Sequence, residues 1–367
     1  MNNKRFGSFA AIAVAGAVVL SSSVMIQTAT AAPISSAKLT ASLSGTLNGV
    51  GSSAQAVAET TWAAGFQTKN SNVTVNYNPL GSGAGLTSFE SGAAEFGGSD
   101  AYLADSDLQT GKFANCAAGT TAIDIPVYIS PIALAYNVAG VKNLTLDAKT
   151  IAGIFKGSIT KWNAPAIKKL NKKVKLPSAA ITVVHRSDNS GTTYNFTQYL
   201  ASQASTVWTA AASQTFPYSV GDAAKGTSGV QSAVQNATNS IAYIDESGAG
   251  ALPIAKLIVG GKSTKISAKG AEAVVAKSPF VAGRSANDLA VGIDRTAAAK
   301  GDWPITLVSY LLVCQQYKTA SVGTLVKAYA TYAASPAGQK AAAAQAGSAP
   351  FSKSLSAKVA KAIKTIK

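Results

Sequence analysis

The pattern that most constrains the fold is an alternation of short apolar segments with helical segments along most of the chain. β-branched and aromatic residues gather in the apolar segments, and we expect strands at residues 73–77, 123–127, 132–136, 181–184 and 241–243. Helical spacing follows the turns and predicts helices at 55–67, 85–91, 150–155, 193–204, 230–236, 323–334, 338–346 and 355–366. This alternation indicates an α/β architecture, and a length of 367 residues favours two domains over one.

The N-terminus has the pattern of an export signal. Lys4 and Arg5 precede an apolar run over residues 6–20, and small residues follow up to Ala31. This pattern is typical of a signal peptide, residues 1–31, that is cut after Ala31. A membrane anchor is the alternative, but the serines at 21–23 leave the run short for a membrane span. We expect an exported protein, in a periplasm or at a cell surface, without an evident lipid anchor.

The chain is strongly basic, with a formal net charge of +16 and a dense lysine run over residues 168–175. A solvated basic surface is the ordinary explanation, and attraction to an anionic cell envelope or steering of anionic ligands is the alternative. Nucleic acid is not an expected partner, because an exported protein is separated from the nucleic acid of the cell and the sequence has no aromatic-basic binding motif. With one histidine and two cysteines, we expect no metal site and no cofactor.

The two cysteines, Cys116 and Cys314, lie far apart in the sequence. An exported protein meets an oxidising environment, so a disulfide between them is one expectation. Two buried free thiols are the other. The choice depends on whether the fold brings the two regions together.

Four turns rich in Gly, Ser and Thr stand out, at residues 49–53, 81–85, 97–100 and 186–192, and all but the third precede predicted helices. The fourth turn places Arg186, one of four arginines, beside a Ser-Gly-Thr sequence at a helix start. A helix start offers free backbone N–H groups and a partial positive charge. With hydroxyl groups and a guanidinium added, such turns predict a pocket for a small tetrahedral oxyanion.

Asp100, in the third turn, would repel an anion that carries no proton. Phosphate keeps a proton at neutral pH and sulfate does not, so this carboxylate can accept a hydrogen bond from phosphate and disfavour sulfate. The alternative is that Asp100 caps a helix near Ala104. Asp188 has two similar interpretations, since it either orients Arg186 or caps the helix at Ser190. The only histidine, His185, is expected to be structural.

The order and spacing of these turns resemble the substrate-binding protein of the high-affinity phosphate ABC transporter, which has a type II periplasmic-binding-protein fold. The resemblance runs from about residue 43 to the C-terminus and includes 49–53, 81–83, 96–100, 150–159, 162–163, 186–192, 241–243 and 303–305. It implies two α/β lobes, joined by two crossing strands, with a ligand cleft between them. With crossings near 127–132 and 303–309, lobe one would be 42–129 plus 305–367, and lobe two 130–304. Cys116 and Cys314 would then share a lobe, which favours the disulfide.

The resemblance also implies the ligand-binding residues, which come from all four turns. They are Ser53, Ala54, Ser82, Asp100, Arg186, Ser190, Gly191 and Thr192, with Asp188 behind the arginine. The family often has Thr-Phe-Pro where this chain has Ser53-Ala54-Gln55, but serine keeps the hydroxyl and the next position contributes mainly its backbone N–H.

The implied function is capture of inorganic phosphate, as hydrogen phosphate or dihydrogen phosphate. The protein would act as a monomer and deliver phosphate to an ABC transporter permease in the membrane, with no catalytic residues. An adhesin or envelope-binding protein that uses the basic face is the alternative. A phosphatase is less favoured, because the chain has a single histidine and no G-x-S-x-G nucleophile elbow.

Overall fold

A computed structural model describes residues 42–367, so the predicted signal peptide lies outside the described residues. The strands are β1 (Gly45–Gly51), β2 (Val73–Asn78), β3 (Phe96–Ser99), β4 (Ala122–Asn137), β5 (Thr145–Leu146), β6 (Thr182–Arg186), β7 (Asp222–Ala224), β8 (Ser240–Asp245), β9 (Lys256–Val259), β10 (Lys262–Thr264) and β11 (Thr306–Cys314). The α-helices are α1 (Ala56–Lys69), α2 (Ser82–Glu90), α3 (Ala148–Lys156), α4 (Pro165–Leu170), α5 (Gly191–Gln203), α6 (Gly226–Asn236), α7 (Ala268–Ala276), α8 (Ala320–Ala334), α9 (Pro336–Ala346) and α10 (Lys353–Lys364). Among the described helices, none combines the length and the apolar character needed to cross a membrane.

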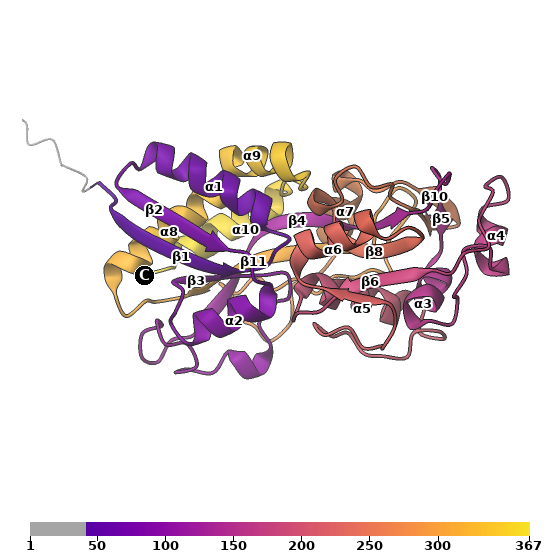
Figure 1. Cartoon of the computed structure of the whole chain (residues 1–367). Helices are drawn as coiled ribbons and strands as arrows, with labels where there is room; N and C mark the ends of the chain where they lie inside the picture. Colours follow the sequence, from indigo (N-terminus) through magenta and orange to yellow (C-terminus); the bar gives the residue numbers. More distant parts are fainter. Residues whose placement is uncertain (1–41) are drawn as a thin grey trace, which may run out of the picture. The chain divides into compact units, whose positions relative to one another are not determined.

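One mixed sheet of eight strands organises the described residues, in the order β2-β1-β3-β11-β4-β8-β6-β7, and β10, β9 and β5 form a separate three-stranded sheet (Figure 1). β1 pairs in parallel with β2 and β3, and β6 pairs in parallel with β7 and β8. β11 and β4 run antiparallel between these two groups. We call β2-β1-β3-β11 the first half-sheet and β8-β6-β7 the second half-sheet. The predicted α/β architecture is confirmed.

β4 corrects the sequence prediction, which placed separate strands at 123–127 and 132–136. It is one continuous strand whose neighbour changes: Pro131 pairs with β11, and the next residue, Ile132, pairs with β8. Pro131 therefore lies where the ladder changes partners, a position that tolerates a missing N–H. β4 thus passes from the first half-sheet to the second within the predicted crossing at 127–132.

The second part of β4 alternates large and small residues, and the two faces enter different cores. Ile132, Leu134 and Tyr136 belong to the main apolar core. Ala133 and Ala135 face a smaller core that includes Val230 and Val234 of α6. All five of these β4 residues are fully buried, so the small side chains leave the space that α6 occupies.

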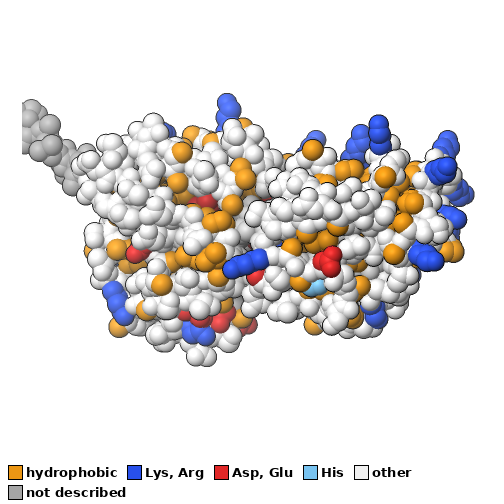
Figure 2. All heavy atoms as spheres, viewed as in Figure 1, with side chains coloured by type: hydrophobic (Ala, Val, Ile, Leu, Met, Phe, Trp, Pro, Cys, Tyr) orange, Lys and Arg blue, Asp and Glu red, His pale blue; other side chains and the backbone are white. Residues whose placement is uncertain are grey.

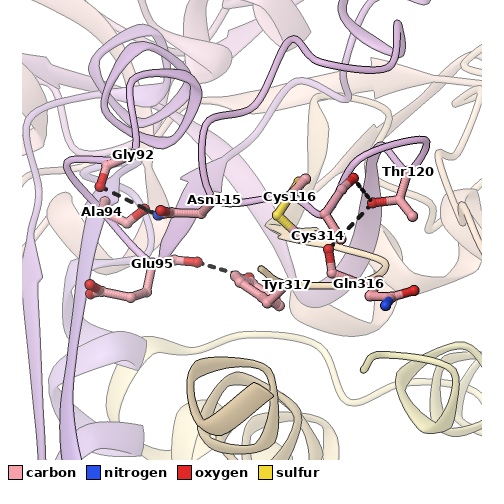
Figure 3. Close-up of a disulfide and its surroundings, with 10 residues drawn as sticks. Gly92, Ala94, Glu95, Asn115, Cys116, Thr120, Cys314, Gln316 and Tyr317 are labelled. Atoms are coloured by element: carbon pink, nitrogen blue, oxygen red, sulfur yellow. Dashed lines mark hydrogen bonds between the residues drawn. A yellow bond between two sulfur atoms is a disulfide. The ribbon is translucent and has the colours of Figure 1, made fainter. Parts of the chain in front are cut away.

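The predicted disulfide between Cys116 and Cys314 is confirmed (Figure 3). Cys314 ends β11, and Cys116 lies in the loop before β4. Both cysteines are buried. Tyr317 forms an isolated antiparallel β-bridge with Cys116, and its hydroxyl donates a hydrogen bond to the carbonyl of Glu95 at 2.8 Å. Sequence alone left free thiols open, because 198 residues separate the two cysteines and only the antiparallel β4–β11 pairing brings their regions together.

Replacing both cysteines with serine is expected to lower the free energy of unfolding by about 2–5 kcal/mol, because the cross-link limits the unfolded chain over a long loop. Urea unfolding followed by circular dichroism measures this. The wild type in dithiothreitol is the matched control and should reach the midpoint of the double serine variant. Equal midpoints for the oxidised wild type and the variant would contradict a stabilising role.

A second buried feature gives stability a defined pH dependence. Glu59 of α1 is completely buried, and one carboxyl oxygen accepts a hydrogen bond from Tyr329 of α8 at 2.6 Å. The other oxygen, Oε1, has no partner among the described residues. Burial raises the pKa of Glu59 from 4.5 to about 8, although the Tyr329 hydrogen bond opposes the change.

We expect the free energy of unfolding to fall as the pH rises from the ordinary pKa of Glu59, 4.5, to its raised pKa of about 8. A carboxyl with a raised folded-state pKa contributes its full stability below its unfolded pKa, and this stability is lost as the pH rises through about 8. Thermal melting from pH 5 to pH 9 should therefore show a steeper decline for the wild type than for Glu59→Gln. Glu272→Gln on α7 is the matched control and should keep the wild-type slope. A Glu59→Gln slope equal to that of the wild type would refute this role.

Candidate functional site

The four predicted turns stand at the ends of strands in both half-sheets. The first and third include the last residues of β1 and β3, which are parallel neighbours, so their carboxyl ends meet. The second opens α2, and the fourth joins β6 to α5. Turns from the first half-sheet therefore face a helix start from the second, and hydrogen bonds between them fix the arrangement.

Ser82 joins three of the turns. Its Oγ accepts hydrogen bonds from the backbone N–H of Asp100 at 3.2 Å and from that of Gly191 at 3.1 Å. Thr192 donates its hydroxyl to Asp100 Oδ2 at 3.1 Å. Ser82 begins α2 and Asp100 follows β3 of the first half-sheet, while Gly191 and Thr192 begin α5. These predicted residues are therefore brought together, and their side chains are almost fully buried.

The carboxylate of Asp100 lies within this cluster. Ser309 of β11 donates its hydroxyl to Asp100 Oδ1 at 2.5 Å. The alternative that Asp100 caps a helix near Ala104 is wrong, because the N-cap of the short helix at Asp105–Asp107 is Ala104, whose N–H donates to Asp107 at 3.0 Å. Burial raises the pKa of Asp100, while hydrogen bonds from Ser309, Ser52 and Thr192 and the charge of Arg186 oppose it.

Arg186 and Asp188 form a two-pronged ion pair at the end of β6. Nε of Arg186 is 2.7 Å from Asp188 Oδ1, and Nη2 is 2.5 Å from Oδ2. Burial acts to raise the pKa of Asp188, but the hydrogen bonds and charge of Arg186 outweigh it, so the net pKa is lowered. Asp188 therefore orients the guanidinium. It does not cap α5, because the Oγ of Ser190 accepts the Thr193 N–H.

This pairing leaves part of the guanidinium available. Nη1 of Arg186 makes no hydrogen bond to another residue in the described chain, whereas Nε and Nη2 are held by Asp188. The Arg186 side chain is only 4% exposed and is held at Nε and Nη2, so its remaining N–H groups point in one direction.

The first turn lies against a different helix start. The Oγ of Ser53 accepts the backbone N–H of Thr227 at 3.0 Å and is 3.0 Å from the Thr227 hydroxyl. Ala54 is fully buried, and its N–H donates to the Ser52 hydroxyl. Neither Ser53 nor Ala54 is hydrogen-bonded to the other predicted residues. The link is indirect, since Gly226, next to Thr227, donates its N–H to Asp188 at 3.1 Å.

Close backbone approaches explain two of the glycines. A Cβ at Gly191 would lie 2.7 Å from both the Ser82 hydroxyl and the Asp100 Cβ, so a side chain there would push the two half-sheets apart. Gly81 has a φ of 104°, and a Cβ on it would overlap the carboxylate of Asp188.

Sequence reasoning missed Ser309, Thr227 and Asn195. Thr227 follows Gly226 at a helix start, a Gly-Thr pattern like that of the fourth turn, which was a usable signal. Ser309 lies inside a strand and Asn195 inside a helix, where no turn marks them. His185 stacks on Phe216 with ring centroids 4.3 Å apart, as expected for a structural histidine.

The arrangement combines donors with one acceptor. Arg186, the hydroxyls and the backbone N–H groups at the start of α5 can donate, while Asp100 can only accept when it is ionised. Such a set fits a tetrahedral oxyanion that carries a proton. Within residues 42–367, no group of three or more His, Cys, Asp or Glu side chains is placed to hold a metal ion.

The basic lysine run lies elsewhere, on α4 and the loop after it, where Lys168, Lys169, Lys172, Lys173 and Lys175 are exposed. Figure 2 shows Lys and Arg side chains gathered at the end of the molecule where Figure 1 labels α4. The run contributes no residue to the cluster around Ser82, Asp100 and Arg186.

Comparison with known proteins gives consistent matches. Residues 36–337 match the family model described as PBP superfamily domain. The chain is 37% identical to phosphate-binding protein PstS 3 of Mycobacterium tuberculosis over 90% of each protein. Among solved structures, a high affinity periplasmic phosphate-binding protein (PfluDING) bound with phosphate superposes with a TM-score of 0.70 at 23% identity, covering 86% of this chain and 93% of the other. A phosphate binding protein from Stenotrophomonas maltophilia gives a TM-score of 0.67 at 20% identity, with 87% and 94% covered.

Proposed function

We propose that this chain, which belongs to the PstS phosphate-binding proteins within the PBP superfamily, captures inorganic phosphate between two lobes and delivers it to an ABC transporter permease. The observation that carries this proposal is the Asp100 carboxylate, which is buried and bonded across the two half-sheets to Thr192, within a cluster that also offers a partly free Arg186. This cluster supplies both the donors and the acceptor that hydrogen phosphate or dihydrogen phosphate requires.

The proposed ligand contacts are those predicted from the sequence: Ser53, Ala54, Ser82, Asp100, Arg186, Ser190, Gly191 and Thr192, with Asp188 behind Arg186. The bonds that already join Ser82 to Gly191 and Asp100 to Thr192 support the central part of this set. The contacts of Ser53 with the start of α6 support a role in holding the halves together. Phosphate bound here would be surrounded by donors from both lobes and removed from water.

We also propose the lobe boundaries that the sequence implied, with lobe one formed by 42–129 plus 305–367 and lobe two by 130–304. The change of partner on β4 between Pro131 and Ile132, and the start of β11 at Thr306, support these boundaries. A hinge at these two strands would let the lobes open and close around the ligand.

The protein is proposed to work outside the cytoplasm, after removal of residues 1–31, as a monomeric binding protein without catalysis and without an evident lipid anchor. An adhesin or a phosphatase is not favoured by the relatives, which are named as phosphate-binding proteins. Incubation with a phosphate monoester should release no phosphate.

The decisive experiment is calorimetric titration of residues 32–367 with phosphate and, separately, with sulfate. We expect saturable binding of one phosphate per chain and much weaker binding of sulfate. The absence of phosphate binding, or equal affinity for both anions, would contradict the proposal.

A further inference from the structure

Arg295 is a buried cation outside the predicted site. Its side chain is 2% exposed, and it forms no ion pair with a carboxylate among the described residues. All five of its N–H donors instead meet neutral acceptors: Nη1 donates to the carbonyls of Pro304 and Thr306, Nη2 to Asn195 and Gln198, and Nε to Gln198. An uncompensated buried charge is costly, so this complete set of acceptors needs a structural or functional reason.

The acceptors of Arg295 lie at the start of β11, which is one of the two proposed hinge strands, and on α5, which begins with proposed ligand contacts. Pro304 and Thr306 lead into β11, at 2.6 Å and 2.9 Å from Nη1. Asn195 and Gln198 lie on α5, the helix whose start carries Gly191 and Thr192. Arg295 therefore ties the crossing at β11 to the helix that presents the ligand-binding turn.

Asn195 extends this connection to the other half-sheet. Its Oδ1 must face Arg295, which has no acceptor of its own, and the distance to Nη2 is 2.8 Å. The orientation of the amide is then fixed, and Nδ2 donates to the carbonyls of Asp100 at 2.6 Å and Gly191 at 3.0 Å. Asn195 is 2% exposed, so both bonds are shielded from water.

We propose that Arg295 and Asn195 are positioning residues that hold the closed, phosphate-bound arrangement, with Arg295 fixing the Asn195 amide so that it bonds to the Asp100 backbone across the cleft. This inference rests on the proposed function. Asn195 does not touch the ligand. It stabilises the closed form only, because opening would separate α5 from Asp100 and break the 2.6 Å bond.

The test compares two alanine variants that remove different acceptors from Arg295. Gln198 accepts two hydrogen bonds from Arg295, at 2.9 Å and 3.2 Å, and has no bond to Asp100. Asn195 accepts one and bonds to Asp100. If the cluster served only to satisfy Arg295, Gln198→Ala would disturb phosphate binding at least as much as Asn195→Ala.

The rates of phosphate association and dissociation separate these roles, measured by rapid filtration with radiolabelled phosphate and an unlabelled chase. We expect Asn195→Ala to raise the dissociation rate about tenfold, the effect of losing one buried hydrogen bond, with little change in the association rate. Gln198→Ala should dissociate at close to the wild-type rate. Asn195→Ser, which is too short to reach Asp100, should behave like Asn195→Ala and replaces it if the alanine variant does not fold.

Equal dissociation rates for the wild type and Asn195→Ala, or equal increases in both alanine variants, would overturn the inference. A change confined to the association rate would also overturn it, because a contact made only on closure acts on dissociation. Failure of the wild type itself to bind phosphate would instead refute the proposed function. Melting temperatures of all variants verify that each is folded under the assay conditions.

Discussion

Replacing Arg186 with alanine is expected to weaken phosphate binding by roughly a thousandfold. The change removes the available Nη1 and also leaves Asp188, held at 2.7 Å and 2.5 Å in the wild type, as an unpaired carboxylate beside the anion. Loss of attraction and gain of repulsion therefore act in the same direction. Isothermal titration with phosphate measures the effect, and near-wild-type affinity would refute the site.

Two further variants separate these contributions. Arg186→Lys keeps the charge but loses the planar fork that Asp188 holds, so its affinity should lie between those of the wild type and Arg186→Ala. Adding Asp188→Asn to Arg186→Ala removes the unpaired carboxylate and should restore part of the lost affinity. An Arg186→Ala, Asp188→Asn protein no better than the single variant would show that repulsion by Asp188 is negligible.

Asp100→Asn is expected to reduce the preference for phosphate over sulfate by about two orders of magnitude, because a buried polar group discriminates strongly between ligands that do and do not pair with it. The wild-type carboxylate accepts hydrogen bonds from Ser309 and Thr192, and an anion without a proton offers it only repulsion. Asparagine has nearly the same shape, and its amide can donate to an unprotonated oxygen. Phosphate affinity should therefore fall while sulfate affinity rises.

Titrations with both anions at one ionic strength test this change in selectivity. Asp222→Asn, at an exposed carboxylate on β7, is the matched control and should keep the wild-type ratio of affinities. If Asp100→Asn binds both anions more weakly by the same factor, Asp100 contributes to packing and not to selectivity.

The sequence was informative where local chemistry decides the structure. The fourth turn predicted a helix start, and α5 begins at Gly191 with Ser190 as its cap. The predicted helices near 55–67 and 338–346 correspond to α1 and α9 within a few residues. β1 and β3 were missed because each has few apolar residues and ends in glycines or serines, so that pairing with neighbouring strands stabilises them more than their own composition does.

The candidate site shows the same division between local and distant information. Asp100 and Arg186 were found because they stand in turns with a recognisable chemistry. Ser309 reaches Asp100 only because β11 lies between β3 and β4, a strand order that no local pattern specifies. The orientation of the Asn195 amide likewise depends on a hydrogen bond from Arg295, which lies 100 residues later in the chain.

β4 has a consequence for insertions and deletions in this family. Ser309 of β11 pairs with Tyr128 and Tyr310 with Pro126, so Val127 is an extra residue whose carbonyl is taken by Gln339 at 2.7 Å. Neighbouring residues of a strand point to opposite faces of the sheet, so the extra residue determines which face each later side chain of β4 occupies. Deleting one residue here would turn Leu134 and its large neighbours toward α6, where only alanines fit. β4 should thus vary by substitution among relatives while its length stays constant, even where the surrounding loops gain or lose residues.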